Sequence, residues 1–368
     1  MVRVLIEASC MVDARRDAGI GRYARHLTDA LADIPDVDVR LAQPLRPPRS
    51  ESRPGRFIHA QPAALRAATR MKPDLIHGVG GEPVAGFPLA RQVVTVHDVE
   101  MWRQGAATER RDVALKAYGM TLATLLRECG AIIAVSRASA NEAVATLGLR
   151  RERVRVVPEG VSPDFSATAS GLDREVLREL GLAPGGYILW AGSLRRHDPR
   201  KGLDVLVDAV ARLGGDGLPL ALAGSAGAEA DRLLDVAARR GCRLVLCGRR
   251  ADSELAALYR NAAVFALAST HEGFGLAALE AMACGAPVVA TAVGNLPDLC
   301  GDAALLVPSG DAAVIASALR AVLGVGRRAA AMRRAGVERA AGFTWDRAAR
   351  ETVGVYRSLV ADLTTRRR

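Results

Sequence analysis

The sequence predicts an α/β protein built from two doubly wound parallel sheets. The chain has 368 residues, more than the ~250–300 at which a single hydrophobic core usually stops growing. Apolar runs of strand length alternate with helical patterns from one end to the other, as in parallel sheets covered by helices. Half of the residues are hydrophobic and only 4% are aromatic, which suits interiors made of Ala, Val and Leu.

The first half contains six candidate strands. They are VRVLIEA (2–8), VDVRLAQ (37–43), LIHG (75–78), VVTVHD (93–98), AIIAVS (131–136) and VRVVPEG (154–160). Their connections include helical patterns near 20–33, 110–128 and 137–147. The segment 44–56 has several prolines and no periodicity, so we expect a surface loop there.

The second half is more regular and repeats the same plan. Its candidate strands are YILWAG (187–192), LPLALAG (218–224), CRLVLCG (242–248), VFALAS (264–269), PVVAT (287–291) and AALLVP (303–308). Turn residues between 162 and 186 indicate the link between the domains. Two such sheets would place the C-terminal ends of their strands, where α/β folds bind ligands, on either side of one crevice.

Composition narrows the class of partner. The net charge is +10, but only Lys72, Lys116 and Lys201 are lysines. The positive charge therefore reflects mainly a chain-wide preference for arginine over lysine, and by itself it does not indicate an anionic partner. Arginine clusters at 46–56 and 150–155 could still meet anionic lipid or a phosphorylated acceptor. No aromatic residues are interleaved with them, which argues against nucleic acid.

Cysteine usage and hydropathy predict the compartment. The six cysteines form no CxxC pair and are expected as reduced core residues. No apolar run reaches the ~18 residues that a membrane span needs. We therefore expect a cytoplasmic protein, with peripheral contact at the inner face of the membrane as an open alternative through the basic clusters.

The stretch HEGFGLAALEAMACGAPVVAT (271–291) carries the strongest functional signal. It follows a strand through a glycine-rich turn into a helix that starts near Leu276, and a helix start suits a phosphate. Glu280 lies just over one turn inside, within reach of a sugar hydroxyl, and Glu272 precedes the helix. The alternative is a solvated Glu280, but its neighbours are apolar and an unpartnered carboxylate there is costly.

This stretch resembles the Glu-x(7)-Glu segment of the retaining glycosyltransferases of family four. Other segments agree with the family in order over nearly the whole chain: GIGRYARHL (19–27), DLIHG (74–78), TVHD (95–98), VVPEGV (156–161), PRKGLDVLVDA (199–209), LCGRRADSELAALYRNAAVFALAS (246–269) and FTWDRAARETVGVY (343–356). The family has the GT-B fold, two facing Rossmann-like domains with a cleft between them. The resemblance implies an acceptor domain at 1–165, a nucleotide-sugar donor domain at 166–344 and a helix at 345–368 that crosses back to the first domain.

The resemblance also implies roles for individual residues. Glu280 would bind the ribose and Glu272 the hydroxyls of the donor sugar. Lys201 would stabilise the departing diphosphate, because fixed cations lower the barrier where negative charge grows, and Arg200 or Arg195 would supply a second cation. Further donor contacts are expected from Gly19, Gly21, Gly248, Arg249, Phe274, Gly275, Leu276 and Ala277.

On the acceptor side, His97 and Asp98 end a strand, so we expect both at the crevice. The resemblance places such a histidine beside the donor sugar, whereas Asp98 and Tyr23 are expected to contact the acceptor. His77 has a weaker case and could equally be buried. The sequence departs from the family at Ala277, where many relatives have proline, and at Glu159 in PEGVS.

We therefore expect a retaining, metal-independent enzyme without a cofactor. It would move a hexose, with mannose the first candidate, from a GDP- or UDP-linked donor to a hydroxyl on a glycan, lipid-linked or small-molecule acceptor. The acids of DVD (36–38) are expected as turn residues and not as metal ligands.

Two alternatives stay open. An NAD-dependent oxidoreductase would use GIGRYA (19–24) as a dinucleotide loop, although ten residues separate Ala8 from Gly19 and the fingerprint belongs directly after the strand. A non-catalytic nucleotide-sugar-binding protein would keep the donor site and need no reactive His97.

Overall fold

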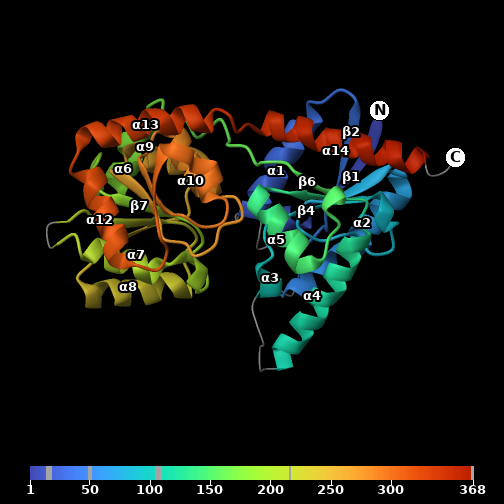
Figure 1. Ribbon diagram of the computed structural model, residues 1–368, viewed down its shortest axis with the longest axis horizontal. Helices are drawn as coiled ribbons and strands as arrows, with labels where there is room; N and C mark the ends of the chain where they lie inside the picture. The colour runs from blue at the N-terminus through green and yellow to red at the C-terminus, as the bar shows by residue number, and fades with distance from the viewer. Residues whose placement is uncertain (14–18, 49–51, 104–109, 215–216, 366–368) are drawn as a thin grey trace. The chain divides into compact units, whose positions relative to one another are not determined.

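The computed structural model describes residues 1–13, 19–48, 52–103, 110–214 and 217–365 (Figure 1). The chain divides into two compact units. The first consists of Met1–Gly160 and Thr344–Arg368, and the second of Val161–Phe343. The chain thus leaves the first unit after Gly160 and re-enters it at Thr344.

The first unit is built on a six-stranded sheet with the order β2-β1-β3-β4-β5-β6. All neighbouring strands are parallel. The strands are β1 (Val2–Glu7), β2 (Val37–Ala42), β3 (Leu75–Gly78), β4 (Gln92–Val96), β5 (Ala131–Ala134) and β6 (Val154–Val156). The strand order changes direction between β1 and β3, so ligands are expected at the C-terminal ends of these strands and their neighbours.

Six α-helices and three 3-10 turns belong to the described part of the first unit. The α-helices are α1 (Gly19–Ala32), α2 (Arg53–Met71), α3 (Glu100–Arg103), α4 (Arg110–Glu128), α5 (Arg137–Leu147) and α14 (Trp345–Thr365), and the 3-10 turns are η1 (Ser9–Met11), η2 (Leu89–Arg91) and η3 (Arg151–Arg153). Helices α1 and α14 lie side by side (Figure 1). The C-terminal segment therefore supplies a covering helix to the N-terminal sheet.

Helix α2 begins inside the segment that the sequence predicts as a loop, so that prediction is wrong for its last residues. Ser52 is the N-cap, and its hydroxyl accepts a hydrogen bond of 3.2 Å from the Gly55 N–H. Pro54 stands in the first turn, where its fixed φ favours a helix start. Local capping therefore overrides the proline-rich composition, while residues 49–51 of the expected loop lie outside the described residues.

The second unit has a six-stranded parallel sheet with the order β12-β11-β10-β7-β8-β9. Its strands are β7 (Ile188–Ala191), β8 (Leu220–Ala223), β9 (Leu244–Gly248), β10 (Val264–Leu267), β11 (Val288–Thr291) and β12 (Ala304–Val307). Counted within the unit, this is the 3-2-1-4-5-6 order of a nucleotide-binding fold. The direction changes between β7 and β10, which makes the loops after these two strands the expected ligand-binding loops.

Helices cover both faces of the second sheet (Figure 1). They are α6 (Leu172–Glu179), α7 (Leu203–Ala211), α8 (Ala228–Arg240), α9 (Asp252–Asn261), α10 (Leu276–Ala283), α11 (Leu296–Cys300), α12 (Ala312–Leu323) and α13 (Gly326–Ala340), with 3-10 turns η4 (Pro199–Lys201) and η5 (Gly301–Ala303). Helices α7 and α8 lie on one side of β7, and α9, α10 and α13 on the other (Figure 1). All six cysteines are buried thiols, and none of the described helices is long and apolar enough to cross a membrane.

Candidate active site

The loops that follow β7 and β10 are joined at the point where the second sheet changes direction. Gly202 has a φ of +61°, and a Cβ at this position would lie 2.0 Å from the carbonyl oxygen of Ala268. The Thr270 N–H donates a hydrogen bond of 2.7 Å to the carbonyl of Arg200. Only glycine allows this close approach at a positive φ, so the two loops hold a fixed relation to each other.

This junction brings together two residues that the sequence singled out. The Lys201 Nζ donates to Glu272 Oε1 at 3.1 Å, and the Ser269 hydroxyl donates to the same oxygen at 2.8 Å. The side chains of Lys201 and Glu272 are 32% and 14% exposed. An ammonium group and a carboxylate are therefore held next to each other, within reach of solvent, at the expected ligand-binding edge.

Helix α10 starts directly after this pair. Its N-cap Gly275 has a φ of +101°, and the N–H groups of Ala278 and Leu279 donate to the Gly275 carbonyl. The amides of Leu276 and Ala277 precede the first bonds of the helix, and such amides favour an anion. The start of α10 therefore adds positive potential beside Lys201.

Glu280 lies one turn inside α10 and is only 2% exposed. The Tyr259 hydroxyl donates a hydrogen bond of 3.2 Å to its Oε2. The apolar surroundings that argued against a solvated Glu280 are thus real, and the carboxylate is partnered from α9. A buried, oriented carboxylate can accept hydroxyl groups of a ligand at low entropic cost.

The other expected donor contacts differ in their placement. Arg200 is engaged with Asp198 through Nε and Nη2, at 2.9 and 2.8 Å. Burial opposes ionisation of Asp198, but the hydrogen bonds and charge of Arg200 outweigh it and lower the pKa of Asp198. Phe274 is 5% exposed and packs edge-to-face on Phe343, so only its backbone is placed to meet a ligand. Arg195 lies in the loop after β7, Gly248 ends β9 and Arg249 follows it, and both arginines are exposed.

A cluster of ion pairs that the sequence did not indicate anchors the loop after β7, which carries Arg200 and Lys201. His197 Nδ1 lies 3.0 Å from Glu229 Oε2, and Arg232 forms paired hydrogen bonds with both Glu229 and Asp204. The hydrogen bonds from Arg232, followed by that of His197, lower the pKa of the Glu229 carboxyl despite its burial. Since the partners come from α7 and α8, the cluster anchors the loop that carries Arg200 and Lys201.

In the first unit, both ring nitrogens of His97 face acceptors. Nε2 lies 3.0 Å from the Val79 carbonyl and Nδ1 lies 3.4 Å from Glu159 Oε1. Because a carbonyl only accepts, Nε2–H donates to Val79, while Nδ1 faces the Glu159 carboxyl group. Glu159, the residue that departs from the family pattern, therefore holds His97 in place and is itself 4% exposed.

Tyr23 belongs to a buried polar network and not to an exposed surface. Its hydroxyl lies 3.0 Å from Thr95 Oγ1, which lies 2.8 Å from His77 Nε2. His77 Nδ1 lies 2.6 Å from the hydroxyl of Tyr356 on α14. Burial, with a smaller effect of His97, lowers the pKa of His77 to about 3. The expectation that Tyr23 contacts the acceptor needs an accessible side chain, and the structure leaves it 1% exposed.

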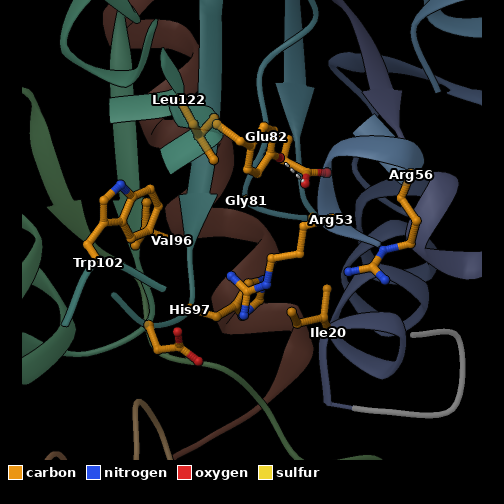
Figure 2. A pocket seen from close by; sticks show the side chains of 12 residues that line it. Ile20, Arg53, Arg56, Gly81, Glu82, Val96, His97, Trp102 and Leu122 are labelled. Carbon is orange, nitrogen blue, oxygen red and sulfur yellow. Dashed lines mark hydrogen bonds between the residues drawn. The ribbon is translucent and has the colours of Figure 1, made fainter. Parts of the chain in front are cut away.

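Asp98 lines a pocket of about 220 Å³ at the C-terminal ends of β3 and β4 (Figure 2). The Asp98 carboxylate accepts a hydrogen bond of 3.1 Å from the Glu100 N–H, which fixes it at the start of α3. His97 lines the same pocket. The remaining lining residues are Ile20, Arg53, Arg56, Gly80, Gly81, Glu82, Val96, Trp102, Tyr118 and Leu122.

Two glycines that were expected to contact the donor lie in a helix. Gly19 and Gly21 form the first turn of α1, and Gly21 is buried. A dinucleotide fingerprint occupies the tight turn directly after β1, whereas here η1 follows the strand and α1 begins only at Gly19. The structure therefore does not support the GIGRYA segment as a dinucleotide-binding turn.

The two acids of the DVD segment lie at the start of the edge strand β2, where Asp36 precedes the strand and Asp38 is its second residue. Asp36 pairs with Arg357 at 3.3 Å, and Asp38 pairs with Arg40 at 3.2 Å. Both carboxylates are thus engaged by arginines on the surface of the unit.

Comparisons with known proteins identify the family and the fold of this chain. The profile of the family described as "Glycosyltransferase Family 4" matches residues 18–165, and that described as "Glycosyl transferases group 1" matches residues 185–324. A D-inositol 3-phosphate glycosyltransferase of Salinispora tropica is 32% identical, over 93% of this chain and 77% of its own length. The O-antigen chain mannosyltransferase B of Escherichia coli is 29% identical, over 93% of this chain and 96% of its own.

Solved structures with the same fold include sucrose-phosphate synthase from Thermosynechococcus elongatus, with a TM-score of 0.77, 24% identity and coverage of 98% and 99% of the two chains. Anabaena Alr3699/HepE in complex with UDP-glucose matches with a TM-score of 0.72 and 19% identity, over 99% and 100%. These likenesses concern the GT-B fold, and the sequence relatives concern the family. The chain is therefore a glycosyltransferase of family 4, with a second domain of the group 1 type, as its sequence indicated.

Proposed function

We propose that this enzyme transfers a hexose from a nucleoside-diphosphate sugar to an acceptor hydroxyl with retention of anomeric configuration. The donor binds at the junction of the loops after β7 and β10. Lys201 and the amides of Leu276 and Ala277 contact the diphosphate. Glu280 accepts the ribose hydroxyls, and Glu272 accepts hydroxyls of the hexose.

The contact between Lys201 and Glu272 is the observation that carries this proposal. The ammonium group and the carboxylate lie 3.1 Å apart beside a helix start, so one site can bind both a negatively charged group and a hydrogen-bond donor. The cation suits the phosphate and the carboxylate suits sugar hydroxyls. Because the sugar and the β-phosphate of a nucleotide sugar share one bond, a ligand of this class satisfies both groups at once.

The reaction follows from the charges that the site provides. The acceptor oxygen attacks the anomeric carbon on the face from which the phosphate leaves. The bond between the anomeric carbon and the oxygen of the β-phosphate breaks. The leaving β-phosphate takes up the acceptor's proton. Negative charge on the departing diphosphate is greatest in the transition state, where Lys201 stabilises it most. We propose that this cation and the helix amides make a metal ion unnecessary, and that His97 orients the sugar.

The identity of the donor is proposed from the relatives. HepE is described in complexes with UDP and UDP-glucose, and the Escherichia coli relative is named as a mannosyltransferase. We propose GDP-mannose as the first donor to test and UDP-hexoses as the second. The acceptor is a hydroxyl on a glycan, a lipid-linked sugar or a small molecule.

Calorimetric titration with GDP, UDP, ADP, NAD and the corresponding nucleotide sugars tests this proposal. We expect one nucleoside diphosphate to bind in the presence of EDTA. Lys201→Ala and Glu280→Ala should each weaken its binding about 10- to 150-fold, because a charged hydrogen bond is worth about 1.5–3 kcal/mol. Arg239→Ala, which removes an exposed charge from α8 in the same unit, should have no effect.

Turnover and stereochemistry complete the test. The anomeric configuration of the product, read by NMR, should equal that of the donor. Binding of NAD alone would contradict the donor site, and binding of a nucleotide sugar without hydrolysis or transfer would favour a binding protein. Activity that is lost with EDTA and restored by Mn²⁺ would contradict metal independence.

A further inference from the structure

The two oxygens of the Glu272 carboxylate have different surroundings. Oε1 accepts two hydrogen bonds, one of 3.1 Å from Lys201 Nζ and one of 2.8 Å from the Ser269 hydroxyl. Oε2 has no hydrogen-bond partner in the part of the chain that the structure describes, and the side chain is partly exposed. One oxygen is therefore occupied by the protein, and the other is left to accept hydrogen bonds from a ligand.

The main chain around Glu272 is fixed by the loop after β11. The Asn295 N–H donates a hydrogen bond of 3.1 Å to the Glu272 carbonyl, and a Cβ at Gly294 would lie 2.0 Å from the same oxygen. The Asn295 side-chain amide donates to the Phe274 carbonyl at 2.9 Å. With the backbone held on both sides of Glu272, the orientation of its carboxylate depends on the rotatable bonds of the side chain.

Ser269 is placed to fix that orientation. It follows the end of β10 and is fully buried. Its carbonyl accepts a hydrogen bond of 2.5 Å from the hydroxyl of Thr291, the last residue of β11. The serine is thus held by two neighbouring strands of the sheet. A residue that is itself fixed by burial and hydrogen bonds can hold a ligand-binding side chain in one geometry.

Lys201 cannot hold Glu272 in the same way. Its ammonium group is a charge on a flexible side chain, and this side chain is more exposed than that of Glu272. In the proposed reaction the ammonium group contacts the diphosphate, which draws it away from the carboxylate. Ser269 is then the remaining partner of Oε1. The serine therefore preserves the orientation of Glu272 in the state in which the donor is bound.

We propose that Ser269 is a positioning residue of the transfer reaction. Its hydroxyl holds Oε1 of Glu272, so that Oε2 meets a hydroxyl of the donor hexose. Ser269 is buried and acts on the sugar only through Glu272. An acceptor group that is already ordered binds the sugar at a lower cost in side-chain entropy than a mobile one. This inference rests on the proposed function and adds a residue to the same site that the sequence did not single out.

The role of Ser269 depends on the presence of the hexose. A nucleoside diphosphate has no hexose hydroxyl for Glu272 to accept, so its affinity should not depend on the Ser269 hydroxyl. A nucleotide sugar carries that hydroxyl. Removal of the serine hydroxyl should therefore weaken the binding of the nucleotide sugar and leave that of the nucleoside diphosphate intact, whereas a general disturbance of the loop would weaken both.

Calorimetric titrations of the full chain and of Ser269→Ala measure this difference. The probes are two pairs, GDP with GDP-mannose and UDP with UDP-glucose. For the pair that binds, Ser269→Ala should lower the affinity for the nucleotide sugar about fivefold or more and leave the affinity for the nucleoside diphosphate unchanged. Release of the hexose to water from the same donor should slow by a similar factor, and this assay needs no knowledge of the natural acceptor.

A double-mutant cycle shows whether Ser269 acts through Glu272. In a Glu272→Ala background, Ser269→Ala should have no further effect on the affinity for the nucleotide sugar or on the release of the hexose. Thr291→Val is the matched control, because it removes another buried hydroxyl hydrogen bond, the one to the Ser269 carbonyl, and keeps the Ser269 hydroxyl. It should lower the melting temperature and leave both affinities nearly unchanged.

Three results would overturn the inference. One is that Ser269→Ala leaves the affinity for the nucleotide sugar unchanged or lowers both affinities equally. Another is that the losses of Ser269→Ala and Glu272→Ala add in the double variant. The last is that Thr291→Val has the same effect as Ser269→Ala. If the unmodified enzyme binds a nucleoside diphosphate, these results remove only the role of Ser269; if it binds none, the proposed function fails and this inference with it.

Discussion

Protonation of His77 should couple the stability of the first unit to pH. The side chain is fully buried between Thr95 and Tyr356, and its pKa is lowered to about 3 from an ordinary value of 6.5. Between these two values the unfolded chain binds a proton that the native state does not. Stability therefore rises with pH across this window and is lost as pH falls from 6.5.

The size of the effect follows from the displacement of the pKa. Each pH unit below 6.5 costs 1.36 kcal/mol while the native ring stays neutral. At pH 5 the loss is about 2 kcal/mol from this one residue, a large part of the stability of an ordinary domain. A glutamine at position 77 keeps polar atoms for both hydroxyl partners but has no proton to bind in this range.

Urea denaturation at pH 7 and at pH 5 measures this difference. The three tryptophans include two in the first unit, Trp102 and Trp345, so a Trp190→Phe background makes fluorescence report that unit alone. In this background, the stability lost between pH 7 and pH 5 should be about 2 kcal/mol smaller for His77→Gln than for the parent. Equal losses would refute the assignment of a buried neutral His77, whatever the absolute stability of the variant.

Two further substitutions test the second unit. Gly202→Ala should abolish donor binding, because the new Cβ forces apart the loops that carry Lys201 and Glu272. The control is Gly241→Ala, since Gly241 has a similar φ of +66° but open space around it. This variant should lower the melting temperature without affecting donor binding. Tyr259→Phe should weaken nucleoside-diphosphate binding about fivefold or more, because it removes the hydrogen bond that orients Glu280. Tyr187→Phe removes another buried hydroxyl hydrogen bond and should lower only the free energy of unfolding, and each variant should lose about 1 kcal/mol of that stability. Equal calorimetric affinities for the two variants would contradict the role of Glu280.

The strands and the glutamates could be predicted because their signals are local. Buried parallel strands read as short continuous apolar runs, and eleven of the twelve strands of the described residues fall within the predicted segments, while β4 begins one residue earlier, at Gln92. Glu272 and Glu280 stand out for the same reason, since glycines and an apolar helix surround them. Sequence patterns of this kind report on neighbours within one or two turns.

Contacts between distant segments were beyond that reach. Lys201 and Glu272 are 71 residues apart, and their contact depends on the strand order and on the φ of Gly202. Nothing in GIGRYARHL reveals that the Tyr23 hydroxyl is hydrogen-bonded to Thr95, 72 residues away. The start of α2 lies in a segment whose prolines suggest a loop, although Ser52 and Pro54 together form a recognisable helix start.

The return of the chain into its first unit has a consequence for synthesis. Residues 161–343 form a contiguous segment and can fold as soon as they leave the ribosome, whereas the first unit lacks α14 until residues 345–365 have been synthesised. During that interval the face of α1 that carries Tyr23 has no covering helix, and His77 has no tyrosine partner. A message truncated after codon 343 would therefore yield a finished second unit attached to an unfinished first one, which quality-control proteases would degrade preferentially. Folding of the first unit therefore depends on the synthesis of α14.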